Sequence, residues 1–214
     1  MKTPFENGQT HPRIRRGARG AAGLLGAALM AVALCAAPGT ATASGAFITP
    51  KYPAAAPAGA RGICQKYGWA CERSAGKALD EASILRLAKT LNRKINRSVR
   101  PVSDERQYRR AEFWTLPTTR GGDCEDFVLL KKKTLAEAGI PSDRLLMATV
   151  LDRDLNNHAI LILRTARGDL VLDNLTDRIV PWEKTRYTFL RMQNPERLDR
   201  WDAIFAGGLI GERG

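Results

Sequence analysis

The segment 121–173 constrains the fold of this 214-residue chain more than any other part of the sequence. It begins with two glycines and Asp123, which predict a loop and an N-cap, and continues with a strong helical pattern at 124–138. Three short apolar runs, bounded by polar turn residues, follow: 145–151, 158–164 and 169–173. Such runs predict strands, and a turn at 167–168 places the last two in an antiparallel hairpin. We therefore expect a helix followed by antiparallel strands.

A second, amphipathic helix is predicted upstream, at 78–97. Its apolar residues recur at helical spacing: Ile84, Leu87 or Ala88, Leu91 and Ile95. Basic residues lie on or near its other face and indicate a solvated surface, because they lack the interleaved aromatic residues of a nucleic-acid interface. Residues 102–120 show no regular pattern. No nucleic-acid partner is expected, despite a formal net charge of +12.

Residues 1–43 have the pattern of a signal peptide for export. Arginines precede a small, apolar stretch at 21–36, and a small-x-small motif predicts cleavage after Ala43. A retained membrane anchor is the alternative, although the stretch is short for a membrane span. Cleavage leaves 29 basic and 21 acidic residues, a net charge of +8, and a single histidine, His158.

The remaining chain divides into a leader and one domain. Residues 44–62 are rich in Ala, Pro and Gly, which is typical of a flexible linker. Residues 63–214 are predicted to form a single domain. With 44% hydrophobic and 26% charged residues, the composition is that of a globular protein and excludes collagen-like, coiled-coil and wholly disordered chains.

Three cysteines remain after cleavage. Cys64 and Cys71 flank a short loop, and in an oxidising compartment two such cysteines most simply form a disulfide. A metal or redox pair is the alternative, although the spacing matches no redox motif. This pairing leaves Cys124 as a free thiol, which is either buried and inert or reactive.

Cys124 begins the helix 124–138, where the helix dipole and the unpaired N–H groups favour a thiolate. Three acidic neighbours oppose that effect: Asp123, Glu125 and Asp126. A base or a cation close to the thiol is therefore needed. His158, at the start of a predicted strand, is the candidate base, since a cysteine nucleophile requires a base within hydrogen-bond reach.

Two aspartates are candidates to orient His158. A two-residue loop at 167–168 places Asp177 directly opposite His158, whereas Asp173 lies on the same face but four residues away. A contact between His158 and Asp173 requires an earlier turn or a bulge. The hairpin geometry alone does not choose between the two aspartates.

Four motifs occur in the order found in one known family: GGDCEDF, a helix ending in AGIP, NHAILIL and GDLVLDNL. With AEFWTLP upstream, the chain resembles the bacterial transglutaminase-like cysteine proteases over about residues 63–205. The resemblance implies a papain-like, transglutaminase-like α+β core, in which the helix bearing the cysteine packs on an antiparallel sheet. It also implies a triad of Cys124, His158 and Asp173, with Asp173 selected by its place in the LDN motif. Trp114 is the candidate aromatic donor to the oxyanion, beside the backbone N–H of Cys124.

The resemblance carries further expectations. Relatives are calcium-dependent periplasmic proteases that cleave large surface adhesins under the control of a cyclic-di-GMP receptor, a biofilm function. The acidic pair beside the family cysteine, here Asp123 and Glu125, is linked to calcium there; Asp126, Asp152 and Asp154 are further candidate ligands. We expect a periplasmic cysteine endopeptidase with a protein substrate in the envelope or on the surface, and no organic cofactor.

Two other functions remain open from the sequence. If an amine instead of water resolves the thioester, the enzyme is a transglutaminase or acyltransferase. A non-enzymatic binding module would keep the fold and use its net charge toward an acidic partner in the cell envelope. The presence of Cys124, His158 and Asp173 in order argues against the binding module.

Overall fold

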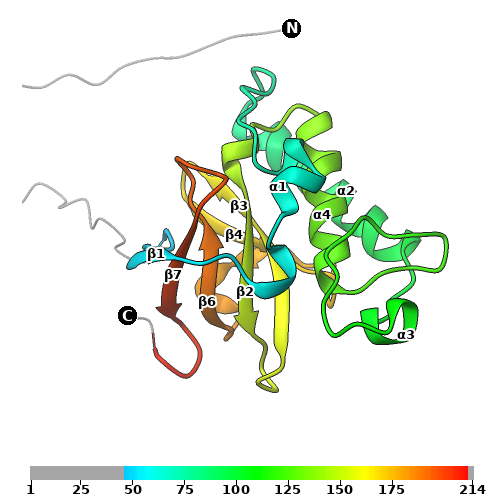
Figure 1. The fold of residues 1–214 in the computed structure, drawn as a ribbon. Coiled ribbons are helices and arrows are strands. Elements are labelled where there is room, and N and C mark those ends of the chain that lie inside the picture. Colours follow the sequence, from blue (N-terminus) through cyan, green and yellow to red (C-terminus); the bar gives the residue numbers. More distant parts are fainter. Residues whose placement is uncertain (1–45, 212–214) are drawn as a thin grey trace, which may run out of the picture. The chain divides into compact units, whose positions relative to one another are not determined.

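The structure is a computed structural model that describes residues 46–211. These residues form a seven-stranded sheet with helices packed against one face (Figure 1). The strands are β1 (Tyr52–Ala54), β2 (Leu145–Leu151), β3 (Asn157–Thr165), β4 (Gly168–Leu172), β5 (Val180–Pro181), β6 (Thr188–Gln193) and β7 (Trp201–Ala206). The helices are α1 (Ile63–Lys66), α2 (Glu81–Ser98), α3 (Asp104–Tyr108) and α4 (Cys124–Glu137). Single 3-10 turns are η1 (Ala58–Ala60), η2 (Gly68–Ala70), η3 (Ser142–Arg144) and η4 (Trp182–Lys184).

The sheet order is β1-β7-β6-β2-β3-β4-β5, and every neighbouring pair is antiparallel. Helix α4 packs on the central strands β2 and β3, and α2 packs on α4. The predicted α+β class, with the cysteine-bearing helix on an antiparallel sheet, is confirmed. No helix within residues 46–211 is long and apolar enough to cross a membrane. The predicted signal peptide, residues 1–43, lies outside the described residues.

The sheet is buried on both faces because the central strands carry runs of consecutive apolar residues. In β2, Leu145 and Met147 join the core under the helices, whereas Leu146 and Ala148 join a second core on the opposite face. The same alternation continues through β3, as expected for side chains that point to alternate faces of a strand. Each buried Leu, Ile or Met side chain contributes about 1.5–3 kcal/mol through removal of apolar surface from water.

The two long helices begin and end near the predicted residues. Helix α2 begins after Asp80, whose carboxylate accepts the N–H of Ser83 at 2.6 Å, a standard N-cap. Helix α4 ends before Gly139, which has a φ of 108° and lies against Lys77, so a side chain there would be both strained and crowded. The segment 102–120, predicted to be irregular, contains the short helix α3.

The prediction that residues 44–62 form a flexible leader is wrong for the part that the structure describes. Ile48 is 2% exposed in the second core, and strand β1 pairs with the edge strand β7. The backbone N–H of Ile48 donates to Asp169 Oδ2 at 2.9 Å, and Lys51 N–H donates to the Ala203 carbonyl at 2.8 Å. The Ala- and Pro-rich composition predicted a flexible linker. The segment is instead held in place by β7 and Asp169, which are distant in the sequence.

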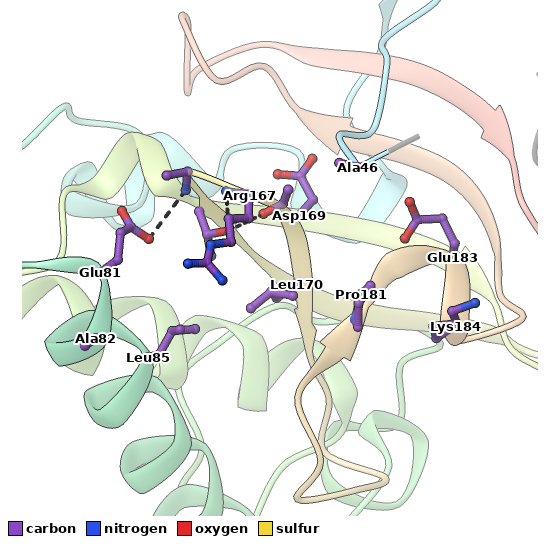
Figure 2. A pocket seen from close by; sticks show the side chains of 13 residues that line it. Ala46, Glu81, Ala82, Leu85, Arg167, Asp169, Leu170, Pro181, Glu183 and Lys184 are labelled. Carbon is purple, nitrogen blue, oxygen red and sulfur yellow. Dashed lines mark hydrogen bonds between the residues drawn. The ribbon is translucent and has the colours of Figure 1, made fainter. Parts of the chain in front are cut away.

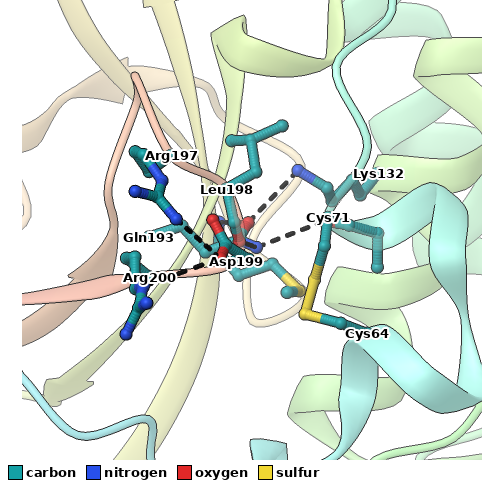
Figure 3. The surroundings of a disulfide bond; sticks show 10 residues. Cys64, Cys71, Lys132, Gln193, Arg197, Leu198, Asp199 and Arg200 are labelled. Carbon is teal, nitrogen blue, oxygen red and sulfur yellow. Dashed lines mark hydrogen bonds and ion pairs between the residues drawn. A yellow bond between two sulfur atoms is a disulfide. The ribbon is translucent and has the colours of Figure 1, made fainter.

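The predicted disulfide is present between Cys64 and Cys71, whose Cα atoms are 5.4 Å apart (Figure 3). The bridge joins α1 to the residue after η2 and packs against the core under the helices. Beside it, Gln193 of β6 donates to the Ala70 carbonyl at 3.2 Å and accepts from Lys132 at 3.2 Å. Among the described residues Cys124 is the one free cysteine.

Candidate active site

His158 and Asp173 form a buried hydrogen-bonded pair at one end of the sheet. His158 Nε2 is 2.9 Å from Asp173 Oδ1, and both side chains are almost fully buried. Asp173 also accepts from the Tyr187 hydroxyl at 2.6 Å and from the Leu175 N–H at 3.0 Å. Burial alone would raise the pKa of Asp173, but the bonds from His158, Tyr187 and Leu175 outweigh it and lower that pKa. Asp173 is therefore an ionised acceptor that fixes the His158 ring.

The register of the β3–β4 hairpin explains why these two residues meet. Thr165 pairs with Gly168, so the turn occupies residues 166–167, one position earlier than predicted. Leu161 consequently pairs with Leu172, and Asp173 follows the last strand residue. That register puts Asp173 two positions from the point opposite His158, a diagonal that longer side chains span.

Asp177, the alternative orienter, lies elsewhere. Its carboxylate is 3.5 Å from Arg97 and 3.9 Å from Arg93, both on α2, and it accepts a 3.2 Å hydrogen bond from Asn96. The loop after β4 carries Asp177 onto helix α2, and the carboxylate bonded to His158 is that of Asp173.

Cys124 is the first residue of α4, and its half-buried sulfur meets the start of β3. The sulfur accepts a hydrogen bond from the backbone N–H of Ala159, the residue after His158. The thiol also lies 3.3 Å from Glu125 Oε2. Burial, followed by the negative charge of Glu125, raises the pKa of Cys124 well above its ordinary value. The acidic neighbours of Cys124 therefore oppose a thiolate, as expected from the sequence, and burial adds to their effect.

Two glycines before Cys124 allow the loop that precedes α4 to pack closely against its neighbours. Gly121 has a φ of 121°, and a Cβ there would lie 2.0 Å from the Arg100 carbonyl oxygen. At Gly122 a Cβ would lie 2.4 Å from an oxygen of Asp126. Close packing therefore requires glycine at both positions. This packing holds the start of α4 against the loop after α2.

Cys124 and His158 line one cavity of about 220 Å³. Its walls come from six parts of the chain: residues 57–59, the 112–114 segment, the start of α4, and the strands β2, β3 and β6. Sequence reasoning missed the contributions of Gly59 and of β6, since nothing near them resembles a catalytic motif. A Cβ on Gly59 would lie 2.5 Å from the Trp114 ring, so this wall fits only glycine.

Trp114 lines the same cavity, 3% exposed. Its indole N–H donates to Glu112 Oε2 at 3.2 Å, and its carbonyl accepts from Lys66 at 2.9 Å. The predicted oxyanion donor is therefore beside the cysteine, but its N–H is bonded to a carboxylate in this structure.

An acidic cluster lies behind Cys124. One oxygen each of Asp104, Asp123 and Glu125 lies within 4.8 Å of the others. Asp123 Oδ1, Glu125 Oε1 and the neighbouring Asp126 Oδ2 are buried and lack a hydrogen-bond partner within the described residues. Such orphaned carboxylate oxygens fit a hard cation, which prefers oxygen ligands. The sequence did not reveal Asp104 as a member of this cluster, because it lies 19 residues before Asp123 in the chain. The structure brings them together: the backbone N–H of Asp104 donates to Asp123 Oδ2 at 3.0 Å.

The carboxylates in this cluster disfavour one another's ionisation, and the charge of Lys66 offsets this only in part. Burial raises the pKa of Glu125 and of Asp104, and the charge of Asp123 raises both further. Burial also raises the pKa of Asp126 to about 7. Asp152 and Asp154, the other candidate ligands, lie in the β2–β3 turn, where Asp152 accepts the N–H of Asp154 and of Asn156 at 2.9 Å; they are not part of the cluster.

A larger groove, of about 970 Å³, lies elsewhere (Figure 2). It runs between the first turn of α2, the β3–β4 turn and η4, and Glu81, Leu85, Arg167 and Lys184 are among its lining residues. Its lining contains neither cysteine nor histidine, so the chemistry belongs to the smaller cavity.

Comparison with known families decides the class of this site. Residues 51–208 match the sequence model of the bacterial transglutaminase-like cysteine proteinases. The chain belongs to this family. As a bacterial transglutaminase-like cysteine proteinase it is an enzyme, a cysteine peptidase.

Solved structures agree with this family's fold. The chain is similar to calcium-bound LapG of Legionella pneumophila, with a TM-score of 0.50 and 22% identity over 58% of this chain and 71% of that one. EGTA-treated LapG of the same organism gives a TM-score of 0.46 and 24% identity over 52% and 63%. The first likeness supports the transglutaminase-like fold. No curated protein sequence matches the chain.

Proposed function

We propose that this peptidase is an exported endopeptidase that cleaves amide bonds with Cys124 as nucleophile, His158 as base and Asp173 as orienter. The observation that carries the proposal is the buried His158–Asp173 pair, whose histidine lines one cavity together with the one free cysteine of residues 46–211. Membership of a cysteine proteinase family supplies the reaction class.

The hydrogen bond to Asp173 fixes the role of each imidazole nitrogen. Nε2 donates its proton to Asp173, so Nδ1 is the nitrogen left to accept the proton of the Cys124 thiol. The resulting thiolate attacks the substrate carbonyl carbon, and the negative oxygen of the tetrahedral intermediate lies at the start of α4, where the Cys124 N–H is available as donor. His158 then protonates the leaving amine, and water hydrolyses the thioester to release the acid and restore the thiol.

Two aromatic residues have supporting roles in this proposal. Tyr187 donates to the second oxygen of Asp173 and packs edge-on against the His158 ring, with centroids 5.8 Å apart. Trp114 serves as a second oxyanion donor once its N–H exchanges Glu112 for the substrate oxygen. Burial raises the pKa of Glu112, whereas the hydrogen bond from the Trp114 indole lowers it.

The acidic cluster is proposed to hold calcium. Asp104, Asp123 and Glu125 would supply carboxylate ligands, with the orphaned oxygen of Asp126 next to them. A bound divalent cation would supply the positive charge that offsets these carboxylates beside Cys124. A similar protein, LapG of Legionella pneumophila, has been solved in a calcium-bound form.

The cellular setting is part of the same proposal. The signal-peptide pattern of residues 1–43 and the Cys64–Cys71 disulfide both favour an oxidising compartment, the periplasm. The substrate is then a protein of the envelope or surface. Its assignment as an adhesin, and control by a cyclic-di-GMP receptor in the inner membrane, rest on the family resemblance.

The test incubates the purified exported protein with cell-envelope proteins and identifies new protein termini by mass spectrometry. Wild type should generate a small set of new termini, Cys124→Ser should generate none, and EGTA should suppress them until calcium is added back. A labelled primary amine is included, because its attachment to the new carboxyl end would indicate acyl transfer. New termini produced equally by Cys124→Ser would refute the nucleophile assignment.

A further inference from the structure

Arg191 of β6 lines the cavity that contains Cys124 and His158. It is exposed, and its guanidinium forms no ion pair with a carboxylate of residues 46–211. By contrast, Arg144 of η3 and Arg164 of β3 pair with Glu81 and Asp169. An uncommitted cation thus borders the space that a substrate would enter.

A β-bulge directs Arg191 toward this space. On β2, Thr149 pairs with Arg191 and the next residue, Val150, pairs with Phe189, so Leu190 is an additional residue in β6. Adjacent residues of a regular strand point to opposite faces, yet Leu190 and Arg191 both line the cavity. Bulges occur beside active sites, where they re-aim side chains.

The cavity carboxylates do not neutralise Arg191. Glu112 is bonded to the Trp114 indole, and Glu125 lies against the Cys124 thiol on the α4 side. Neither comes within ion-pair distance of Arg191, which lies on the opposite, β6 side. The cavity therefore has one cationic wall that is available to a negative group.

We propose that Arg191 determines specificity by binding an acidic side chain, Asp or Glu, close to the scissile bond of the substrate polypeptide. The proposal rests on the proposed function, because it assumes that peptides bind over Cys124. The planar guanidinium suits a carboxylate, with which it forms two parallel, charge-assisted hydrogen bonds. The contact is made equally in the bound substrate and in the transition state, so it acts on KM more than on kcat.

The experiment uses peptides prepared from a bacterial proteome with chymotrypsin, which leaves acidic and basic residues intact. Wild type, Arg191→Glu and Arg167→Glu cleave this library, and mass spectrometry reads the residues around each new terminus. Arg167 is the matched control, since it is an exposed arginine in the β3–β4 turn, at the opposite end of β3 from His158. Melting temperatures establish that each variant is folded.

Wild type and Arg167→Glu should show an excess of Asp or Glu at one position near the cleaved bond, and Arg191→Glu should lose this excess or replace it with Lys and Arg. For the best peptide, exchange of its acidic residue for the amide should raise KM of wild type about tenfold with kcat little changed. The same exchange should leave KM of Arg191→Gln unchanged.

Other outcomes separate the two proposals. Cleavage by wild type with no acidic preference at any position would overturn the role of Arg191 and leave the endopeptidase intact. An acidic preference that survives in both Arg191→Glu and Arg191→Gln would also overturn it. If wild type cleaves no peptide and no envelope protein, the proposed function itself fails and takes this inference with it.

Discussion

Replacing Asp173 with Asn tests the part of the site that the structure defines best. Asp173 accepts hydrogen bonds from His158, Tyr187 and the Leu175 N–H. Asn keeps the volume but has one acceptor oxygen, and its NH₂ group can donate to His158 Nε2. That bond would move the imidazole proton to Nδ1, the nitrogen that must accept the thiol proton. We expect turnover to fall about 10²–10⁴-fold.

The same substitution has a calculable effect on stability. Loss of charge-assisted hydrogen bonds at a site only 3% exposed should cost about 1.5–3 kcal/mol. For a domain of this size, each kcal/mol corresponds to about 2–4 °C of melting temperature, so the variant should melt a few degrees lower and remain folded. A loss of turnover measured at about 25 °C would then result from the altered chemical step and not from unfolding.

Asp177→Asn is the matched control, because a hairpin turn one residue later would have given Asp177 the orienting role. Its ion pairs with Arg97 and Arg93 are part-exposed, so their loss should cost less than about 1 kcal/mol and leave turnover within about twofold of wild type. Initial rates of cleavage and thermal melts of both variants are compared side by side. A crippled Asp177→Asn beside an active Asp173→Asn would refute the reasoning.

Further predictions concern the bridge, the cation and acid stability. Replacing Cys64 and Cys71 with Ser should lower the free energy of unfolding by about 2–3 kcal/mol, measured by denaturant titration; an unchanged midpoint would show that the bridge adds nothing. Calcium should raise the melting temperature of wild type, and Asp104→Asn should weaken that rise; equal shifts in both would exclude Asp104 as a ligand. The lowered pKa of Asp173 implies a stability contribution that is fully present above its ordinary pKa, about 4, and is lost as pH falls further. Asp173→Asn should therefore flatten the acid limb of a melting-temperature profile, and an identical limb would contradict the assignment.

Local patterns predicted the elements that carry the candidate triad. Helix α4 begins at the predicted residue, although the Asp123 side chain does not cap it and instead accepts the N–H of Asp104. β2 spans the predicted residues, and β3 and β4 differ from prediction by one residue at their ends, because apolar runs bounded by turns are a local signal. The one-residue error in the turn mattered, since it decided which aspartate a simple count placed near His158.

The outer strands could not be predicted because their partners are distant. β1 lies in an Ala- and Pro-rich stretch and is a strand only through its pairing with β7. In β6 and β7 the alternation is broken by register shifts at Leu190 and at Phe205, which has a φ of 47°. The same bulge at Leu190 places Arg191 at the cavity, and no local pattern announces it.

The electrostatics of the thiol also depended on tertiary structure. The helix start and the adjacent carboxylates were visible in the sequence, but their balance was not. Burial and the 3.3 Å contact with Glu125 raise the pKa of Cys124 well above its ordinary value, and the extent of that burial could not be read from the sequence. Asp104 joined the cluster through α3, a helix too short to be recognised from periodicity.

The most direct test of the central claim measures how fast Cys124 reacts with iodoacetamide in the native, calcium-loaded protein, since Cys64 and Cys71 are bridged and do not react. The rate is compared in wild type, His158→Gln, Asp173→Asn and the double variant. If His158 accepts the thiol proton and Asp173 acts only through it, His158→Gln should slow the reaction about tenfold or more, and Asp173→Asn should slow wild type but add nothing to His158→Gln. Equal rates in wild type and His158→Gln would contradict the triad.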